Sequence, residues 1–169
     1  VWKIILNLFI LTFRPSKTSR AYKKIWMKEK NMSPLRYYTE MQTIKLSKKI
    51  GNKDVIVDYA MRYGKPSIKS KINNLKENGC ENLVVLPLYP QYAAPTTATV
   101  CDEVYRSLSK MRWQPSLQII PHYESEPIYI DALSKSINKK LEQINWKPDL
   151  IMASYHGIPK KYFEKGDPY

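Results

Sequence analysis

Six consecutive apolar residues stand near the middle of the chain: Leu83-Val84-Val85-Leu86-Pro87-Leu88. Such an unbroken run is typical of a strand in a parallel sheet, because helices cover both faces of that sheet and neither side needs polar residues. A helix with Ile68, Ile72 and Leu75 on its inner side is predicted before the run, from Pro66 to Gly79, and another helix after it. The second helix repeats apolar residues at helical spacing, namely Val100, Val104, Leu108 and Met111. The run therefore predicts one strand of an α/β sheet.

Three further segments have the composition of strands: Asp54–Ala60, Leu117–Ile120 and Leu150–Ala153. Helical patterns separate them, and the last of these helices keeps one apolar face. That face consists of Ile130, Leu133, Ile137, Leu141 and Ile144. Two earlier helices are predicted, from Ser19 to Lys30 and, with Ser33 as N-cap, as far as Gly51. The alternation predicts a doubly wound parallel sheet of four strands, flanked by helices.

The 169 residues include 28 Lys and Arg against 15 Asp and Glu, so the formal net charge is +13. The length fits one domain, or one domain and part of another. The basic residues are scattered in pairs, which favours a solvated surface over the alternative of an anionic partner such as nucleic acid. The five glycines form neither GxGxxG nor GxxxxGK[ST], which excludes those nucleotide-binding loops. Two cysteines without a CxxC pair argue against a disulfide framework or a cysteine zinc site, and for a reducing compartment.

The two ends of the chain have distinct compositions. Val1–Phe13 is an apolar run of 13 residues, shorter than the roughly 20 that a membrane-spanning helix needs. We expect an apolar helix there, either buried or lying at a membrane surface or a cavity lip. The other end, Gly166-Asp167-Pro168-Tyr169, has turn chemistry. With a first residue that is not Met, this pattern predicts a fragment cut at both ends.

Three loops are candidates for function, because ligands of parallel sheets bind outside the carboxyl ends of the strands. They are Met61–Gly64, Tyr89–Thr97 and Ser154–Pro159. The second loop holds two tyrosines and two prolines, which suits either a pocket for a planar apolar ligand or a tightly packed connection.

The chain has two histidines, and they differ in position. His122 follows a predicted strand beside Pro121, with no nearby Cys or His, and is interpreted as a plain loop residue. His156 follows the fourth predicted strand, and an imidazole there can serve as a base or as a metal ligand. Position alone leaves a site role and a structural role for His156 equally open.

Four blocks of sequence closely resemble the ferrochelatase family, in the family's order and near its spacing. The blocks are Arg14-Pro15 with Ala21–Trp26 and Ser33-Pro34-Leu35, Ala60–Ile68, Leu86–Tyr92 with Thr96-Thr97, and Ser154–Pro159 with Gly166–Tyr169. Together they span essentially the whole chain. The resemblance implies an enzyme that inserts ferrous iron into a porphyrin, protoporphyrin IX or coproporphyrin III, to make haem. It also implies two similar α/β halves that grip the macrocycle between them.

The resemblance assigns roles to individual residues. His156 matches the family's histidine for pyrrole deprotonation or metal binding, so it is the predicted catalytic and metal residue. Arg14, Tyr22 and Ser33 fall on positions that bind the porphyrin, and guanidinium groups suit its propionates. Ala94 stands where iron–sulphur members have a cysteine. No cluster ligand is therefore expected at that position, and no prosthetic group is expected at all.

The resemblance also sets expectations for organisation and partners. Residues 1–147 should form the first half, with its first strand missing, and residues 148–169 the beginning of the second half. Such a fragment is expected to be inactive alone. Porphyrin and ferrous iron are the expected partners, without specific nucleic acid, and nothing indicates an oligomeric state. The expected location is the cytoplasm, either free or peripheral to the inner membrane through Val1–Phe13.

Three alternatives to this function stay open at this point. One is a protein that binds a tetrapyrrole without turnover, and another is a basic nucleic-acid-binding domain. The third is a related chelatase for cobalt or nickel, although Tyr89-Pro90-Gln91-Tyr92 argues against it.

Overall fold

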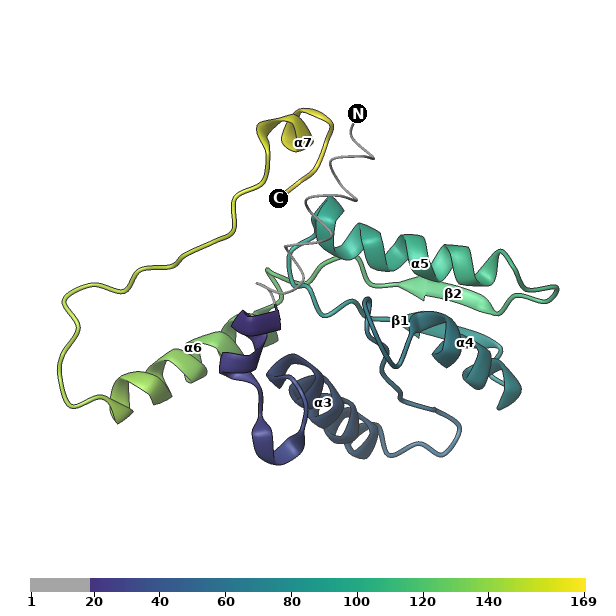
Figure 1. Cartoon of the computed structure of the whole chain (residues 1–169), viewed down its shortest axis with the longest axis horizontal. Helices are drawn as coiled ribbons and strands as arrows, with labels where there is room; N and C mark the ends of the chain where they lie inside the picture. Colours follow the sequence, from purple (N-terminus) through teal and green to yellow (C-terminus); the bar gives the residue numbers. More distant parts are fainter. Residues whose placement is uncertain (1–18) are drawn as a thin grey trace. The chain divides into compact units, whose positions relative to one another are not determined.

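The computed structural model describes residues 19–169 and divides at Pro66 into two compact units (Figure 1). The predictions for Val1–Phe13 and for Arg14 lie outside the described residues. Within residues 19–169, no helix is both long enough and apolar enough to cross a membrane.

The first unit is built around helix α3, Pro34–Ile50. Before it come a helical segment over 19–25 and the short helix η2, Lys28–Lys30. The Ser33 hydroxyl caps α3 by accepting a hydrogen bond from the backbone nitrogen of Arg36 at 3.3 Å. Gly51 ends the helix in the left-handed region, with φ at +62°. The predicted helix and both of its caps are confirmed.

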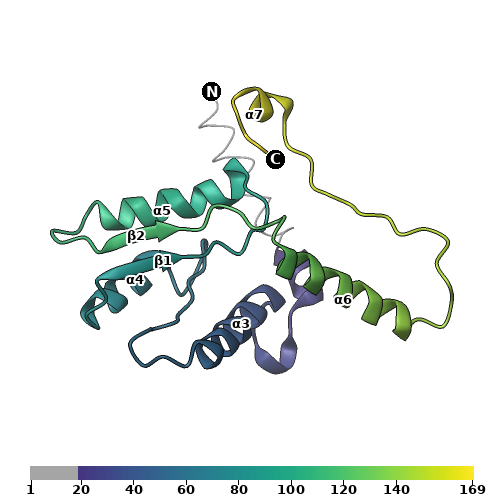
Figure 2. The same cartoon turned by 180° about the vertical axis from the view of Figure 1, so that it is seen from behind.

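The second unit contains the parallel sheet. Its elements are α4 (Ile68–Glu77), β1 (Asn82–Val85), η3 (Ala94–Ala98), α5 (Thr99–Leu108), β2 (Ser116–Ile119), α6 (Pro127–Gln143) and α7 (Lys160–Glu164). β1 pairs in parallel with β2, and Leu83 lies opposite Leu117. Figure 2 shows α4 and α5 running alongside the two strands. Two of the predicted strands and the crossover between them are therefore present.

The core of the second unit comes from α4 and α5, which contact each other. Its buried apolar side chains on these helices are Ile68, Ile72, Val100, Val104 and Leu108. Helical periodicity placed all five on the inner faces of the two helices, together with Leu75 and Met111, which are half-buried. Val104 is 1% exposed and marks the centre of this core.

The prediction of a four-stranded sheet is not met in the described residues, where the sheet has two strands. Segments 54–60 and 150–153 have no strand, and Leu150 and Met152 are 77% and 81% exposed. A strand forms only when a neighbouring strand lies about 4.8 Å away and shares its backbone hydrogen bonds. The composition of a segment does not show whether such a neighbour is present. The boundary predicted between residues 147 and 148 stays a prediction.

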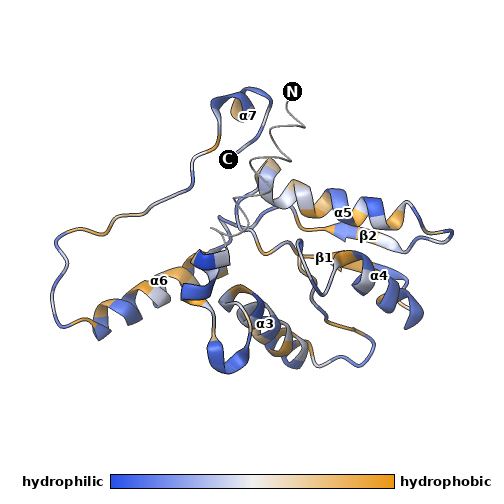
Figure 3. Ribbon diagram, in the orientation of Figure 1, coloured by the Kyte–Doolittle hydropathy of each residue, from blue (hydrophilic) through white to orange (hydrophobic). Residues whose placement is uncertain are grey.

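Three further differences concern burial and strand length. Exposed and half-buried residues alternate along β1 and β2, so only one face of the described sheet is covered, where two were expected. The strand is also shorter than the apolar run that predicted it. β1 ends at Val85, and Pro87 beyond it has no backbone N–H to donate to a neighbouring strand. The predicted helix over Ile130–Ile144 is present as α6, but it buries no residue, although apolar positions recur along it (Figure 3).

Candidate functional site

A pocket of about 410 Å³ opens in the second unit where three segments meet. Its lining residues are Gln91, Tyr92, His122, Glu124, Tyr155, Pro168 and Tyr169. The first two follow β1, the next two follow β2, and the others come from the C-terminal segment. The pocket therefore lies at the carboxyl ends of the two parallel strands, where α/β sheets bind their ligands.

A backbone hydrogen bond joins the two loops that follow the strands. The backbone nitrogen of Tyr123 donates to the carbonyl oxygen of Pro90 at 2.9 Å. The Tyr123 ring packs edge-on against Tyr129 of α6, with ring centroids 5.5 Å apart. Burial, followed by the Tyr129 phenol, raises the pKa of Tyr123, so this ring stays neutral at physiological pH. These contacts fix one side of the pocket.

The C-terminal segment is held by a carboxylate. Asp167 is 8% exposed, and its Oδ2 accepts a hydrogen bond from the backbone nitrogen of Ala94 at 2.7 Å. Its Oδ1 accepts from the backbone nitrogen of Tyr169 at 3.2 Å. Gly166 precedes it with φ at +91°, a conformation that favours glycine. This arrangement brings Pro168 and Tyr169 to the pocket that also contains Tyr92.

Polar groups converge on the pocket from two of its sides. His122 Nδ1 lies 3.0 Å from Glu124 Oε2, and both side chains are partly exposed. On the β1 side, the pKa of Tyr92 is raised, first by burial and then by the charges of Cys101 and Asp167. The Tyr92 phenol therefore keeps its proton at neutral pH and can donate a hydrogen bond.

A wider hollow of about 790 Å³ follows α6, but it offers less chemistry. Leu141, Ile144, Leu150 and Ile151 form much of its wall, with Lys147 and Asp149 as its charged residues. It contains no histidine and no tyrosine, and it follows an exposed stretch of chain. The smaller pocket at the strand ends is therefore the candidate functional site.

Comparison with known proteins identifies the family. The sequence model of the ferrochelatase family matches residues 1–169. The chain belongs to the ferrochelatase family. It is 54% identical over 169 residues to the ferrochelatase of Rhizobium meliloti (strain 1021), covering 99% of this chain and 50% of that protein. It is 53% identical over 169 residues to that of Francisella tularensis subsp. novicida (strain U112), with 100% and 50% covered. The chain spans about half the length of the curated relatives it matches.

The ferrochelatase residues predicted from the sequence fall in different places. Tyr22 and Ser33 belong to the first unit, where Tyr22 is 48% exposed and Ser33 caps α3. His156 is exposed and does not line the pocket, but its neighbour Tyr155 does. Ala94 lies at the start of η3, and its backbone nitrogen is bonded to Asp167. The assigned roles of Tyr22, Ser33 and His156 stay predictions.

Of the three candidate loops, two contribute to the pocket, through Tyr92 and Tyr155. The third, Met61–Gly64, belongs to the first unit. There the Arg62 guanidinium lies over the Tyr63 ring, 4.5 Å from its centroid, and the backbone nitrogen of Met61 donates to the Pro66 carbonyl oxygen at 2.8 Å. This loop is therefore ordered by its own contacts.

Sequence reasoning missed His122, Glu124 and Asp167 as pocket-forming residues. The rule that selected the three loops applies equally to the loop after Ile119, and it would have selected His122 and Glu124. Asp167 belongs to the Gly166–Tyr169 block that resembles the family, but nothing in the sequence indicates its contact with a backbone group 73 positions away.

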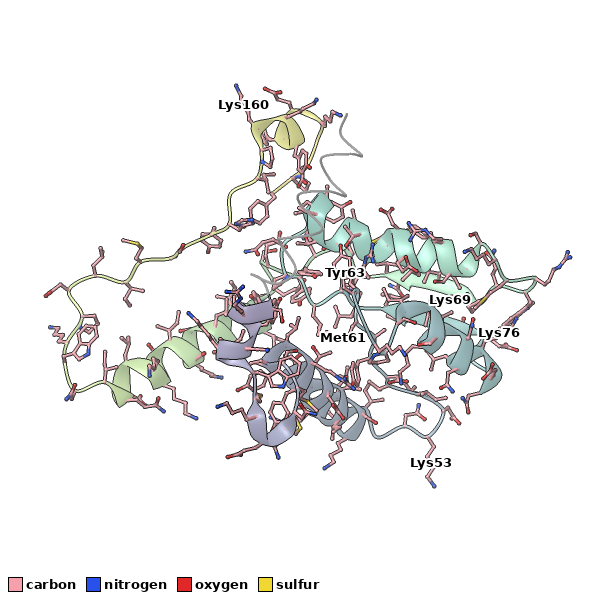
Figure 4. The ribbon with its side chains drawn as sticks, in the orientation of Figure 1. Lys53, Met61, Tyr63, Lys69, Lys76 and Lys160 are labelled. Carbon is pink, nitrogen blue, oxygen red and sulfur yellow. The ribbon has the colours of Figure 1, made fainter. Side chains whose placement is uncertain are left out.

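Charge and metal-binding side chains are dispersed. Figure 4 shows the side chains of Lys53 and Lys160 pointing outward from their own segments. Within residues 19–169, no three His, Cys, Asp or Glu side chains group as a metal site. Cys80 and Cys101 are free thiols. The described residues therefore place no complete set of metal ligands around His156.

Proposed function

We propose that this chain acts in the insertion of ferrous iron into a porphyrin, protoporphyrin IX or coproporphyrin III, to form haem. The observation that supports the proposal is family membership along the whole chain, with 54% identity to a protein named ferrochelatase. Because those relatives are twice as long, we expect the 169 residues alone not to catalyse metal insertion. The proposal is therefore tested on the complete open reading frame that encodes this chain.

The reaction sets a clear requirement for a proton acceptor. A free porphyrin carries two pyrrole protons, and Fe²⁺ replaces both of them, so two protons must leave for each iron inserted. An imidazole with a pKa of about 6.5 accepts protons near neutral pH and also binds divalent metals. We assign this role to His156, as pyrrole base or as metal ligand. Its exposure leaves the imidazole accessible to a ligand, and Tyr155 beside it reaches the pocket.

The pocket supplies surfaces that suit a flat, largely apolar ring. Tyr92, Tyr155 and Tyr169 offer aromatic faces, and Pro168 offers a rigid apolar one. Aromatic rings prefer offset stacking or edge contacts with other rings, so such walls recognise the edge of a planar macrocycle. The hydroxyl of Tyr92 adds a neutral hydrogen-bond donor to these walls.

Three residues are proposed to bind the porphyrin periphery. A guanidinium at Arg14 would pair with a propionate carboxylate in bidentate fashion. Ser33 uses its oxygen as an acceptor for the cap of α3, so its hydroxyl proton remains available for a ligand. Tyr22 is half exposed and presents both a ring and a hydroxyl.

Family membership also supports proposals about the cofactor and the location of the protein. Ala94 has no side-chain donor for iron, so we propose that the protein holds no iron–sulphur cluster through this position. We also propose a cytoplasmic location, with peripheral contact to the inner membrane through Val1–Phe13. Amphipathic and apolar surface segments of this kind bind the interface without crossing it.

The test is porphyrin metallation by the complete reading frame. Free porphyrin fluoresces, and insertion of ferrous iron under anaerobic conditions removes that fluorescence. Loss of fluorescence in proportion to enzyme supports the proposal, with the 169-residue chain run in parallel. Binding of porphyrin without metallation would favour a non-catalytic tetrapyrrole-binding protein. Absence of binding, with salt-dependent binding of nucleic acid instead, would contradict the proposal outright.

A further inference from the structure

Asp167 is the buried charged residue among those that the structure describes, at 8% exposed. Burial of a carboxylate is costly unless hydrogen bonds or charges compensate for it. Here the compensation comes from the backbone nitrogens of Ala94 and Tyr169. Ala94 begins the helical run that continues from η3 into α5, so the carboxylate also faces the positive end of that run's dipole.

The bond from Ala94 to Asp167 joins two walls of the pocket. On one side, Gln91 and Tyr92 lie two to three positions before Ala94. On the other side, Pro168 and Tyr169 follow Asp167 directly. All four of these residues line the pocket, so the length of this one hydrogen bond constrains the separation of the walls.

Few other contacts hold the C-terminal wall in place. The segment between α6 and α7 contains no helix or strand, and α7 buries no side chain. Asp167 itself is tied to α7 through its backbone nitrogen, which donates to the Tyr162 carbonyl oxygen at 3.0 Å. The carboxylate therefore links the whole turn at the end of the chain to the loop after β1.

We propose that Asp167 is a positioning residue that clamps the Pro168–Tyr169 wall to the Gln91–Tyr92 wall and thereby sets the affinity for the porphyrin edge. The part that concerns porphyrin rests on the proposed function. The clamp stands on the hydrogen bonds and on the composition of the pocket. Asp167 acts through the walls and does not itself touch the ligand.

Three variants of the complete reading frame separate the effect of the Asp167 hydrogen bonds from the effect of removing a negative charge. Asp167→Ala removes both hydrogen bonds, whereas Asp167→Asn keeps one oxygen that can accept from Ala94. Asp149→Ala is the matched control, because it removes an exposed carboxylate from the same part of the chain. Circular dichroism and thermal melting establish that each variant is folded before it is compared.

The first readout is hydrogen exchange at the Ala94 amide, which needs no ligand. Pro95 has no amide hydrogen, so the signal of Ala94 is separated from the one that follows. We expect Asp167→Ala to raise the exchange rate at Ala94 about tenfold or more, since a protecting bond is lost. Asp167→Asn should fall between Asp167→Ala and the wild type, and Asp149→Ala should match the wild type. An unchanged rate in folded Asp167→Ala would overturn the clamp.

The second readout is the split between KM for porphyrin and kcat. Loss of wall positioning weakens ground-state and transition-state binding alike, so KM should rise about tenfold in Asp167→Ala while kcat changes less than about threefold. Partial recovery in Asp167→Asn supports the hydrogen bond as the acting interaction. An equal rise in KM in both variants, or an unchanged KM in Asp167→Ala, would overturn the positioning role. If the wild type binds porphyrin but does not metallate it, the proposed function fails, and the porphyrin Kd replaces KM in judging the clamp.

Discussion

The carboxylate of Asp167 accepts a hydrogen bond from the backbone nitrogen of Ala94 at 2.7 Å, although the two residues are 73 positions apart. This contact connects the end of the chain to the start of a helical run beside the parallel sheet. A hydrogen bond to a buried charged group contributes more to stability than one between neutral groups. The contact therefore bears on folding as well as on the pocket.

Replacement of Asp167 by Ala should lower the free energy of unfolding by about 1.5–3 kcal/mol, the usual contribution of a hydrogen bond to a charged group. Denaturant unfolding of the purified protein measures this change. Asp149→Ala, at an exposed position, should alter the same quantity by less than about 0.5 kcal/mol. Equal values for the two variants would contradict the structural role of Asp167.

Val104→Ala should destabilise the second unit by about 2 kcal/mol, because it removes two buried carbon atoms and leaves a cavity. Val104 lies on α5 and is 1% exposed. Val84→Ala makes the identical chemical change on β1, where the side chain is 61% exposed. Its cost should stay below about 0.5 kcal/mol. If the unfolding free energy of both variants depends equally steeply on urea concentration, the difference between their urea midpoints measures the effect of burying Val104.

Ser33 has two proposed roles, capping α3 and binding porphyrin, and two different substitutions distinguish them. Ser33→Ala should cost about 1 kcal/mol of stability, because the N-cap of α3 is lost. Ser33→Asp keeps a cap acceptor, so its stability should stay close to that of the wild type. If the hydroxyl also binds porphyrin, both variants should lose porphyrin affinity in a fluorescence titration. Full affinity in Ser33→Asp would leave capping as its role and remove Ser33 from the porphyrin site.

Stability should fall at alkaline pH. Burial is the main cause that raises the pKa of Cys101 from 9.0, and of Tyr92 and Tyr123 from 10.0. The native state therefore holds these protons more tightly than the unfolded state does. The corresponding stability is complete below the unfolded pKa values and is lost as the pH rises through the native ones. Urea unfolding at about pH 8 and about pH 10.5 should show this loss, and Tyr92→Phe should reduce it. Equal unfolding free energies at the two pH values would contradict it.

Local features of this fold follow from the sequence because their causes are local. Ser33 and Gly51 predict the two ends of α3, since a cap acts within four residues of itself. Apolar spacing predicts the inner faces of α4 and α5, since one helix turn brings positions i, i+3 and i+4 together. The family is recognisable for a different reason: its motifs at Tyr89–Tyr92 and Ser154–Pro159 are specific strings of residues.

The features that escaped prediction depend on distant partners. Segments 54–60 and 150–153 have strand composition, but a strand also needs an adjacent edge, which composition does not reveal. Asp167 has the sequence context of an ordinary turn, and only the folded chain shows that it meets Ala94. His122 belongs to a loop like the others, and its place in the pocket arises from the pairing of Tyr123 with Pro90.

The measurement that tests the central claim most directly is the initial rate of iron insertion by His156→Ala relative to the wild type. The complete reading frame is assayed anaerobically through the loss of free-porphyrin fluorescence, with His122→Ala as the second histidine variant. Loss of a general base costs about 10²–10⁴-fold, so the rate of His156→Ala should fall by at least about a hundredfold. His122 lines the pocket but is not the proposed proton acceptor, so we expect His122→Ala to lose less of the rate than His156→Ala. A wild-type rate in folded His156→Ala would contradict the assignment of His156 as base or metal ligand.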